Sequence, residues 1–415
     1  MNKYILDNGV KLIYEHRPAG ITSFCIGFNG GAIEETDEFP LGTAHAVEHM
    51  VSKGTKTRSE KEINNLCDKI FGFENAMTNF PYVIYYGTSL SEDFKAGFEL
   101  YSDIVLNPAF RKDGFKEEMN IILEELKEWK DDIYQHCEDS LLYNAFNNKR
   151  IKNLIIGTEE SVKSITLKHI KDFYQKYYVP ENCVISVCSS LSCEQILSVV
   201  KEYFGQWLGK NEVISTNIDK SKSNIKMERN MAGIFEEKSG SIGGAKIQYL
   251  FNIEELEENE LKALTLFNAA FGEGTSSVLF EEIRTKNALA YDVGSYIKNE
   301  RGIKIFTINL GTSEDKVQKA LDIIGNKIEE LKKLKGYFNE ERIKELSKNI
   351  KLKRQLKLEK SIQLCKELTT YELMYDRAER IYEEVDGLQS ISEENILEVI
   401  RKVLINPTIQ IITKG

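Results

Sequence analysis

The sequence has no run of about 20 apolar residues, which is the length that an α-helix needs to cross a lipid bilayer. Its first residues, MNKYILDNGVKLIYEH, also lack the uninterrupted apolar region of a secretory signal peptide. We therefore expect a cytoplasmic protein with no membrane partner. Disorder is not expected, because 41% of the residues are hydrophobic and 29% are charged, the balance of a globular protein.

An excess of positive charge is also missing. The formal net charge is −10, and no basic stripe of the kind that binds phosphate groups stands out. Nucleic acid is therefore not an expected partner. The seven cysteines are odd in number and mostly fall in apolar or helical patterns, which favours reduced, structural thiols over a disulfide framework.

The length of the chain predicts more than one domain. A chain of 415 residues exceeds the size at which one hydrophobic core keeps growing, so two domains are expected. The polar stretch 208–230 has few large apolar residues and indicates a linker. Its position predicts an N-terminal domain at 1–207 and a C-terminal domain at 231–415.

Strands and helices are mixed in both halves of the sequence, as their periodicities indicate. In the first half, strands are expected at 10–16, 22–31 and 182–190, with one or two more at 75–90 around Pro81, and helices are expected at 59–71, within 91–177 and at 193–207. In the second half, strands are expected at 245–253, 291–300 and 302–311, and helices at 261–272, 278–289 and within 314–384. This partial recurrence predicts an α+β fold that arose by duplication of one domain.

Histidine is rare, yet two of the five histidines lie four positions apart in GTAHAVEHMVSKGT, residues 42–55. In a helix, residues i, i+3 and i+4 share one face, so His45, Glu48 and His49 would project together. Imidazole nitrogens suit zinc, and two histidines on one rigid element leave room for a third ligand and a water. Glu48 could accept the proton of that water, which is the chemistry of metal-assisted hydrolysis. The H-x-x-E-H spacing is the inverted zinc-peptidase pattern.

The alternative is that these histidines are core or surface residues of a helix, as a lone histidine more often is. The rarity of histidine in the chain and the glutamate between the pair favour the metal site.

A third zinc ligand should be acidic or a histidine and should come from a neighbouring element. The expected helix 115–132 has many carboxylates, and a rotation of about 100° per residue separates them. Glu118 and Glu125 fall on one side at the edge of an apolar face, where carboxylates are costly unless a positive ion compensates them. We expect Glu125 to bind the metal and Glu118 to accompany it, whereas Glu124 points elsewhere. His136, near the same phase, is the alternative ligand.

These residues resemble the pitrilysin or insulinase-type zinc peptidases (family M16), which include the mitochondrial processing peptidases. The resemblance extends over nearly the whole chain. Glu125 lies 76 residues beyond His49, where the third metal ligand of the family occurs, and Glu118 matches a second acidic residue of the family seven positions earlier. The segment Asn75, Ala76, Met77 and Thr78 resembles the edge strand on which the family binds substrate by strand addition.

In the second half, GEGTSSVLFEEIRTKNALAYDVGSY, residues 272–296, is similar to a segment that supplies an arginine and a tyrosine to the active site of the opposite domain. The matching residues are Arg284 and Tyr291. On spacing alone, a helix-surface arginine and a strand tyrosine would be the preferred interpretation. The flanking Gly/Ser turn favours the catalytic one.

The resemblance implies two similar α/β-sandwich domains that form half of a clamshell. It further implies a metalloendopeptidase with one Zn²⁺ per chain, peptide substrates and Glu48 as the general base. Because the chain carries both the metal residues and the Arg/Tyr pair, a homodimer is expected, and a heterodimer with a related subunit is the alternative. Two other functions stay open, namely a protease dedicated to removing the leader of one small modified peptide, and a non-catalytic scaffold subunit.

Overall fold

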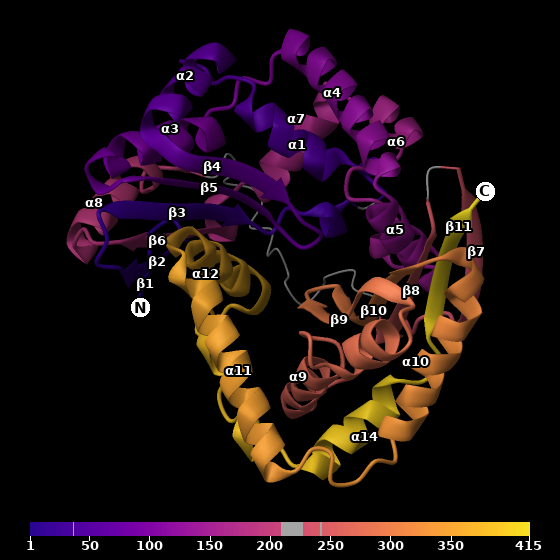
Figure 1. Ribbon diagram of the computed structural model, residues 1–415. Coiled ribbons are helices and arrows are strands. Elements are labelled where there is room, and N and C mark those ends of the chain that lie inside the picture. The colour runs from indigo at the N-terminus through magenta and orange to yellow at the C-terminus, as the bar shows by residue number, and fades with distance from the viewer. Residues whose placement is uncertain (36, 209–226, 241–242) are drawn as a thin grey trace. The chain divides into compact units, whose positions relative to one another are not determined.

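The computed structural model describes residues 1–35, 37–208, 227–240 and 243–415 (Figure 1). The chain divides into two compact units, and each unit is built from three segments. Unit 1 comprises Met1–Leu126, Leu154–Ile225 and Leu356–Ile381, and unit 2 comprises Lys127–Asn153, Lys226–Gln355 and Tyr382–Gly415. The sequence analysis predicted a single division of the chain at the linker, whereas each unit contains segments from both halves of the sequence. Most of the predicted linker 208–230, namely residues 209–226, lies outside the described residues.

Unit 1 contains a six-stranded sheet with the order β1-β2-β6-β3-β5-β4. In that order the strands are β1 (Asn2–Ile5), β2 (Lys11–His16), β6 (Cys183–Ser189), β3 (Ile21–Phe28), β5 (Val83–Leu90) and β4 (Phe71–Thr78). β2 and β6 run parallel, and the other neighbouring strands are antiparallel. Among the described strands, β4 therefore pairs with β5 alone and forms one edge of the sheet.

The central strands of this sheet are buried on both faces. Along β3, Phe24 and Ile26 belong to one apolar cluster, and Cys25 between them belongs to a second cluster on the opposite face. A strand covered on both faces needs apolar residues at successive positions, which accounts for the run FCIGF. The first face is covered by α1 (Thr43–Ser52), α2 (Glu60–Ile70), α3 (Phe94–Leu106), α4 (Lys112–Asp131), α7 (Leu167–Tyr177) and α8 (Cys193–Phe204). The second face is covered by α12 (Ser361–Tyr375), which packs on β3 and β6 (Figure 1).

Unit 2 contains a five-stranded sheet with the order β7-β11-β8-β10-β9. In that order the strands are β7 (Gly233–Ser239), β11 (Thr408–Lys414), β8 (Ala245–Asn252), β10 (Ile303–Thr312) and β9 (Ala290–Glu300). β7 and β11 run parallel and the other pairs are antiparallel. The order and the directions therefore match β2-β6-β3-β5-β4 of unit 1, as a duplication predicts.

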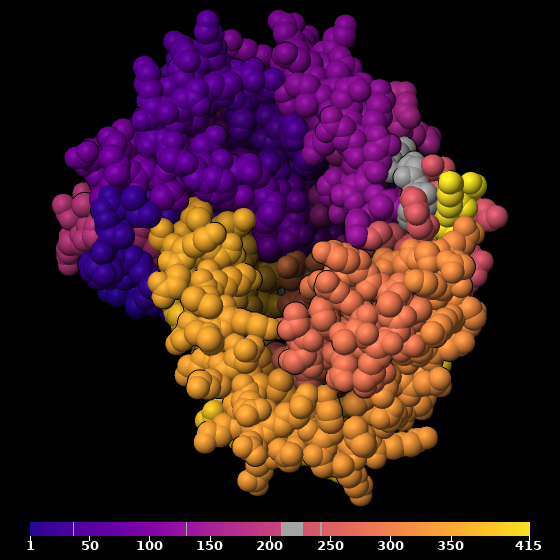
Figure 2. Space-filling view, in the orientation of Figure 1, coloured from indigo at the N-terminus to yellow at the C-terminus, as the bar shows by residue number. Residues whose placement is uncertain are grey.

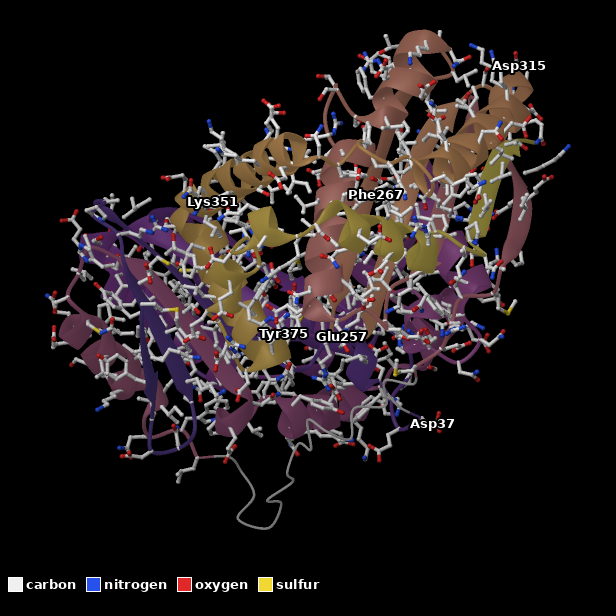
Figure 3. The ribbon with its side chains drawn as sticks, turned by 90° about the horizontal axis from the view of Figure 1, so that it is seen from below. Asp37, Glu257, Phe267, Asp315, Lys351 and Tyr375 are labelled. Carbon is white, nitrogen blue, oxygen red and sulfur yellow. The ribbon has the colours of Figure 1, made fainter. Side chains whose placement is uncertain are left out.

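The core of unit 2 lies between its sheet and several helices. Phe267 on α9 (Glu258–Phe271) is fully buried in this cluster, and Figure 3 labels it. The helices that contribute are α9 (Glu258–Phe271), the π-helix η6 (Phe280–Lys286), α10 (Val317–Leu331), α11 (Glu340–Glu359) and α14 (Glu393–Val403). α5 (Ile133–Ala145), from the first half of the sequence, packs on β8 and β11. The remaining α-helices of the described residues are α6 (Glu159–Ser164) in unit 1 and α13 (Arg380–Glu383), where the chain passes from unit 1 to unit 2.

The α+β class and the two similar domains are confirmed. Sequence patterns did not predict β1, β7, α14 or β11. Lys414, the last residue of β11, is exposed, and the C-terminal end of the chain, yellow in Figure 2, lies at the surface. Within the described ranges, no helix combines the length and apolarity needed to cross a membrane. All seven cysteines are free thiols, and six of them are buried.

Candidate metal centre

The helix α1 carries the two histidines and is held firmly at its start. It follows Gly42, whose backbone is left-handed (φ 91°) and whose position leaves no room for a side chain, because a Cβ would lie 2.4 Å from the carbonyl oxygen of Ile156. The carboxylate of Glu35 accepts hydrogen bonds from the N–H groups of Gly42 (3.1 Å) and Ala44 (2.8 Å). Glu35 is buried, so it satisfies and neutralises the helix N-terminus from within the protein.

The predicted ligands lie together at one point. The Nε2 atoms of His45 and His49 are 3.2 Å apart. Glu125, on α4, places Oε1 3.8 Å from Nε2 of His45 and Oε2 3.6 Å from Nε2 of His49. Donors in a tetrahedron around zinc, at bond lengths of about 2.0–2.1 Å, are roughly 3.3 Å apart. The three side chains therefore fit one metal ion, and they form the metal-ligand cluster found among the described residues.

A hydrogen bond to His49 determines which of its nitrogens faces this point. Nδ1 of His49 lies 2.8 Å from Oε2 of Glu118, which is buried. Because a carboxylate only accepts hydrogen bonds, Nδ1 carries the hydrogen and Nε2 presents its lone pair to the site. The ammonium of Lys53 lies 2.6 Å from the other oxygen of Glu118 and compensates its buried charge.

His45 is also suited to bind a metal. Burial, reinforced by the neighbouring His49, lowers the pKa of His45 to about 3, so its imidazole is neutral at physiological pH. Two imidazoles and one carboxylate form a donor set typical of catalytic zinc. Nδ1 of His45 is buried without a hydrogen-bond partner among the described residues.

Glu48 lies on the same helix face, and its carboxylate is fixed by another element. Oγ1 of Thr78, the last residue of β4, donates a hydrogen bond to Oε2 of Glu48. Burial raises the pKa of the Glu48 carboxyl, and the hydrogen bond from Thr78 and the proximity of His49 partly offset this rise. Thr78 was predicted as part of a substrate strand, and its contact with Glu48 has no signal in the sequence.

The segment from Asn75 to Thr78 occupies the open edge of the unit 1 sheet. These residues pair with β5 from Tyr86 to Val83, and no described strand pairs with their other side. Asn75 is exposed and the other three residues are partly exposed. The backbone on this side can therefore accept an additional strand.

Arg284 and Tyr291 are brought together within unit 2. The guanidinium carbon of Arg284, on η6, lies 4.6 Å from the ring centre of Tyr291 and 4.7 Å from that of Phe280. Tyr291, on β9, is 84% exposed. His136, the alternative metal ligand, also belongs to unit 2, where its Nε2 contacts Glu237 at 2.7 Å.

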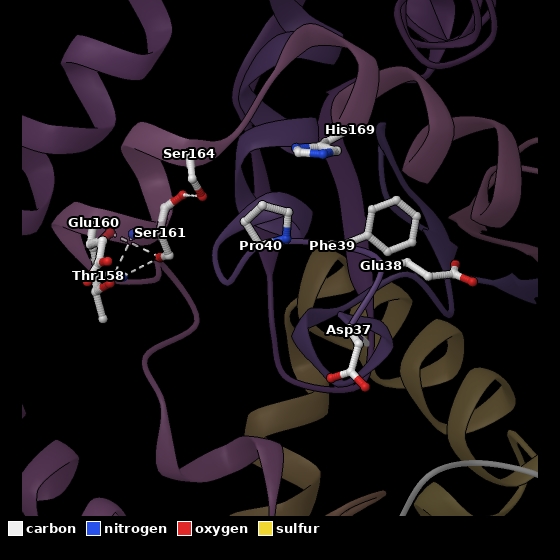
Figure 4. Close-up of a pocket in the computed structure, with 9 residues that line it drawn as sticks. All are labelled: Asp37, Glu38, Phe39, Pro40, Thr158, Glu160, Ser161, Ser164 and His169. Atoms are coloured by element: carbon white, nitrogen blue, oxygen red, sulfur yellow. Dashed lines mark hydrogen bonds between the residues drawn. The ribbon is translucent and has the colours of Figure 1, made fainter.

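Lys53 was missed by the sequence analysis, although it lies four residues after His49, directly after the end of α1. A different cavity of unit 1, of about 520 Å³, contains none of the predicted site residues (Figure 4). It is lined by Asp37, Glu38, Phe39, Pro40, Thr158, Glu160, Ser161, Ser164 and His169.

Several proteins are similar to this chain in sequence. An uncharacterized zinc protease of Rickettsia bellii is 29% identical over 87% of this chain and 82% of its own length. One of Rickettsia felis is 31% identical over 70% of this chain and 67% of its own length. The uncharacterized zinc protease YmxG of Bacillus subtilis is 29% identical over 80% of this chain and 79% of its own length.

Two solved structures share the fold. A crystal structure of a protease from Helicobacter pylori has a TM-score of 0.88 at 18% identity and covers 99% of both chains. A structure described as a peptidase M16 inactive domain, from Pseudomonas fluorescens, has a TM-score of 0.82 at 16% identity and covers 100% of this chain and 98% of its own.

Two family models match the chain in succession. Residues 11–159, which include the metal cluster, match the family described as Insulinase (Peptidase family M16). Residues 164–350, which include Arg284 and Tyr291, match the Peptidase M16 inactive domain. Because these matches cover most of the sequence in the order of the two homologous halves, the chain belongs to the insulinase, or M16, peptidase family.

Proposed function

We propose that this protein is a zinc-dependent endopeptidase that hydrolyses short or unfolded peptides and holds one Zn²⁺ per chain. The observation that carries the proposal is the convergence of His45, His49 and Glu125, with Glu48 beside them. Three protein ligands leave a fourth coordination position open, as catalysis requires. The zinc protease names of the relatives support the same activity.

Each side chain has a defined part in this proposal. Zinc in the site would supply Lewis acidity toward the attacking water and the peptide carbonyl. Glu48 takes a proton from the water and returns it to the leaving amine, while the hydroxyl of Thr78 keeps its carboxylate oriented. The substrate backbone pairs with the edge of β4 from Asn75 to Thr78, so cleavage tolerates many side chains. By resemblance to the family, Tyr291 donates a hydrogen bond to the developing oxyanion and Arg284 supports its ring.

The proposal includes a cytoplasmic homodimer. The metal residues belong to unit 1 and the Arg284/Tyr291 pair belongs to unit 2. In the family such sets come together in a clamshell, and a chain that carries both sets can supply both halves by pairing with itself. A heterodimer with a related subunit is the alternative.

A non-catalytic scaffold is the competing function, because the second half matches a family model described as inactive. That match covers residues 164–350, however, whereas the metal residues lie within 11–159. The complete ligand set therefore favours the enzyme. A protease dedicated to one leader peptide would use the same site, and the cleavage profile on a peptide library distinguishes it from a general peptidase.

The test is incubation of the purified protein with mixed peptides, with and without a chelator, followed by mass spectrometry. Cleavage that disappears with the chelator and returns with zinc is expected. In the Glu48→Gln variant, zinc content should stay near that of the parent while kcat falls by about 10²-fold or more, because the proton acceptor is lost. The Glu124→Gln variant, changed at an exposed position, serves as the control. Parental activity in Glu48→Gln would exclude the assigned base, and chelator-resistant cleavage would exclude the zinc mechanism.

A further inference from the structure

A cavity of about 500 Å³ lies within unit 2, where β8 begins and β10 ends. Tyr291 is part of its lining, together with Lys246, Lys316, Ser313, Asp292 and Tyr134. The lining contains two lysines but a single carboxylate, in a protein whose formal net charge is −10. This local excess of positive charge runs against the composition of the whole chain and points to an anionic ligand.

The ammonium of Lys246 is held in place without a carboxylate. Lys246 on β8 pairs with Gly311 on β10, and a Cβ at position 311 would lie 2.6 Å from Nζ of Lys246. The glycine therefore makes room for the ammonium. Nζ also lies over the ring of Tyr134, 3.1 Å from its centre. Lys246 makes no ion pair with any described residue, so its charge is available to a ligand.

Two further donors line the same cavity. Nζ of Lys316 donates a hydrogen bond to the carbonyl oxygen of Ala288 at 3.0 Å and makes no ion pair in the described chain, which leaves two of its hydrogens available. The hydroxyl oxygen of Ser313 is buried and has no hydrogen-bond partner among the described residues. A buried hydroxyl without a partner is costly, and an acceptor atom in the cavity would satisfy it.

The backbone turns Tyr291 and Asp292 toward this cavity. The β9–β10 pairing shifts register between Leu310 and Thr312, so that these two residues of β9 stand opposite Gly311 alone. Such a β-bulge redirects side chains locally. Tyr291, which is largely exposed, therefore lines the same cavity as the two lysines.

We propose that this cavity binds a carboxylate of the peptide substrate, either an acidic side chain or the C-terminal carboxylate. A carboxylate has about four lone-pair sites and can accept from both ammonium groups and from Ser313 at once. The assignment to a peptide rests on the proposed function, in which Tyr291 contacts the reacting substrate. Cleavage would then favour peptides with a carboxylate at a fixed distance from the scissile bond.

The test measures binding without hydrolysis, using three peptides and the full-length Glu48→Gln protein. The first peptide is Ac-AAAQAA-NH₂, the second replaces its glutamine with glutamate, and the third keeps glutamine but ends in a free carboxylate. Isothermal titration calorimetry should show roughly tenfold tighter binding of at least one charged peptide than of the neutral one. Tighter binding of the second peptide alone identifies a side-chain carboxylate, and tighter binding of the third alone identifies the C-terminus.

Variants of the lysines assign the preference to the cavity. Introducing Lys246→Met and Lys316→Met together should abolish the tighter binding of charged peptides. Lys319→Met, which changes an exposed residue of α10, should preserve it. Gly311→Ala is a second probe, because its methyl group displaces the Lys246 ammonium while keeping the charge, and it should weaken the preference. Equal binding of the three peptides, or a preference that survives loss of both lysines, would overturn the proposal. Absence of hydrolysis by the parent would overturn the proposed function instead and leave this binding result intact.

Discussion

Glu124 and Glu125 are adjacent on α4 but face different surroundings. Glu124 is exposed, whereas Glu125 points its two oxygens at His45 and His49. Glu125→Gln should lower zinc occupancy sharply, because an amide contributes no charge to neutralise the metal, while Glu124→Gln should stay near one zinc per chain. Metal analysis of the dialysed proteins measures this difference. Equal metal loss in both variants would contradict the assignment of Glu125.

Thr78 tests how the proposed general base is held. Thr78→Val keeps the shape of the side chain but removes the hydroxyl that donates to Glu48. Turnover should fall roughly tenfold with zinc content unchanged, as is typical when a partner of an active-site group is removed. Thr78→Ser, which restores the donor, should recover most of the kcat. A Thr78→Val variant with parental kcat would show that the hydroxyl does not orient the base.

Single residues were predictable wherever one helix decides their direction. The spacing of His45, Glu48 and His49 and the phase of Glu118 and Glu125 each depend on rotation about one axis. The contact of Thr78 with Glu48 depends on how a strand edge meets a helix. No periodicity within either element contains that information.

At the scale of elements, the buried carboxylate of Glu372 holds α12 against the unit 1 sheet. Glu372 is 2% exposed, and its oxygens lie 2.7 Å from the ammonium of Lys3 and 2.9 Å from that of Lys11. Burial alone would raise the pKa of Glu372, but hydrogen bonds from these two lysines outweigh it, and the pKa is lowered overall. The carboxylate therefore stabilises the docked helix only while it is ionised.

This contact predicts an acid-dependent loss of stability. Because the folded pKa of Glu372 is lowered, its contribution is present above the unfolded value of about 4.3 and is lost as the pH falls through the folded value. Glu372→Gln should cost about 1–3 kcal/mol at pH 7, and the difference from the parent should shrink below about pH 4. Urea unfolding at several pH values measures this difference in the free energy of unfolding. Glu379→Gln serves as the control, because Glu379 makes a more exposed contact with Lys3. A difference that is independent of pH would contradict the ionised contact.

Elements with strong local patterns were predictable, and those that depend on partners were not. The helix at 59–71 has a capping box between Ser59 and Glu62, and the structure has α2 at Glu60–Ile70. β7 reads GIFEEKS and mixes charge with apolar residues, because it is an edge strand that needs only one buried face. Its pairing with β11, at the far end of the sequence, gives it strand structure that local propensity does not indicate.

At the scale of the whole molecule, the proposed homodimer can be tested by mixing inactive variants. If each site combines unit 1 of one subunit with unit 2 of another, Glu48→Gln and Tyr291→Phe are inactive alone, but their heterodimer contains one intact site. Refolding an equal mixture should restore up to roughly a quarter of parental activity, since about half of the dimers are mixed and each has one good site of two. If a mixture shown by native mass spectrometry to contain the heterodimer stays inactive, the shared site is excluded.

Each unit is assembled from distant segments of the sequence, and this has a consequence for biosynthesis. β6 ends at Ser189, whereas α12, which covers the second face of the same sheet, begins only at Ser361. While the ribosome makes the intervening chain, the apolar side chains of that face, among them Cys25, Ile84 and Val184, have no cover. Neither unit can therefore finish folding until its last segment, 356–381 in unit 1 and 382–415 in unit 2, has been made, and the exposed apolar face is prone to aggregation until then.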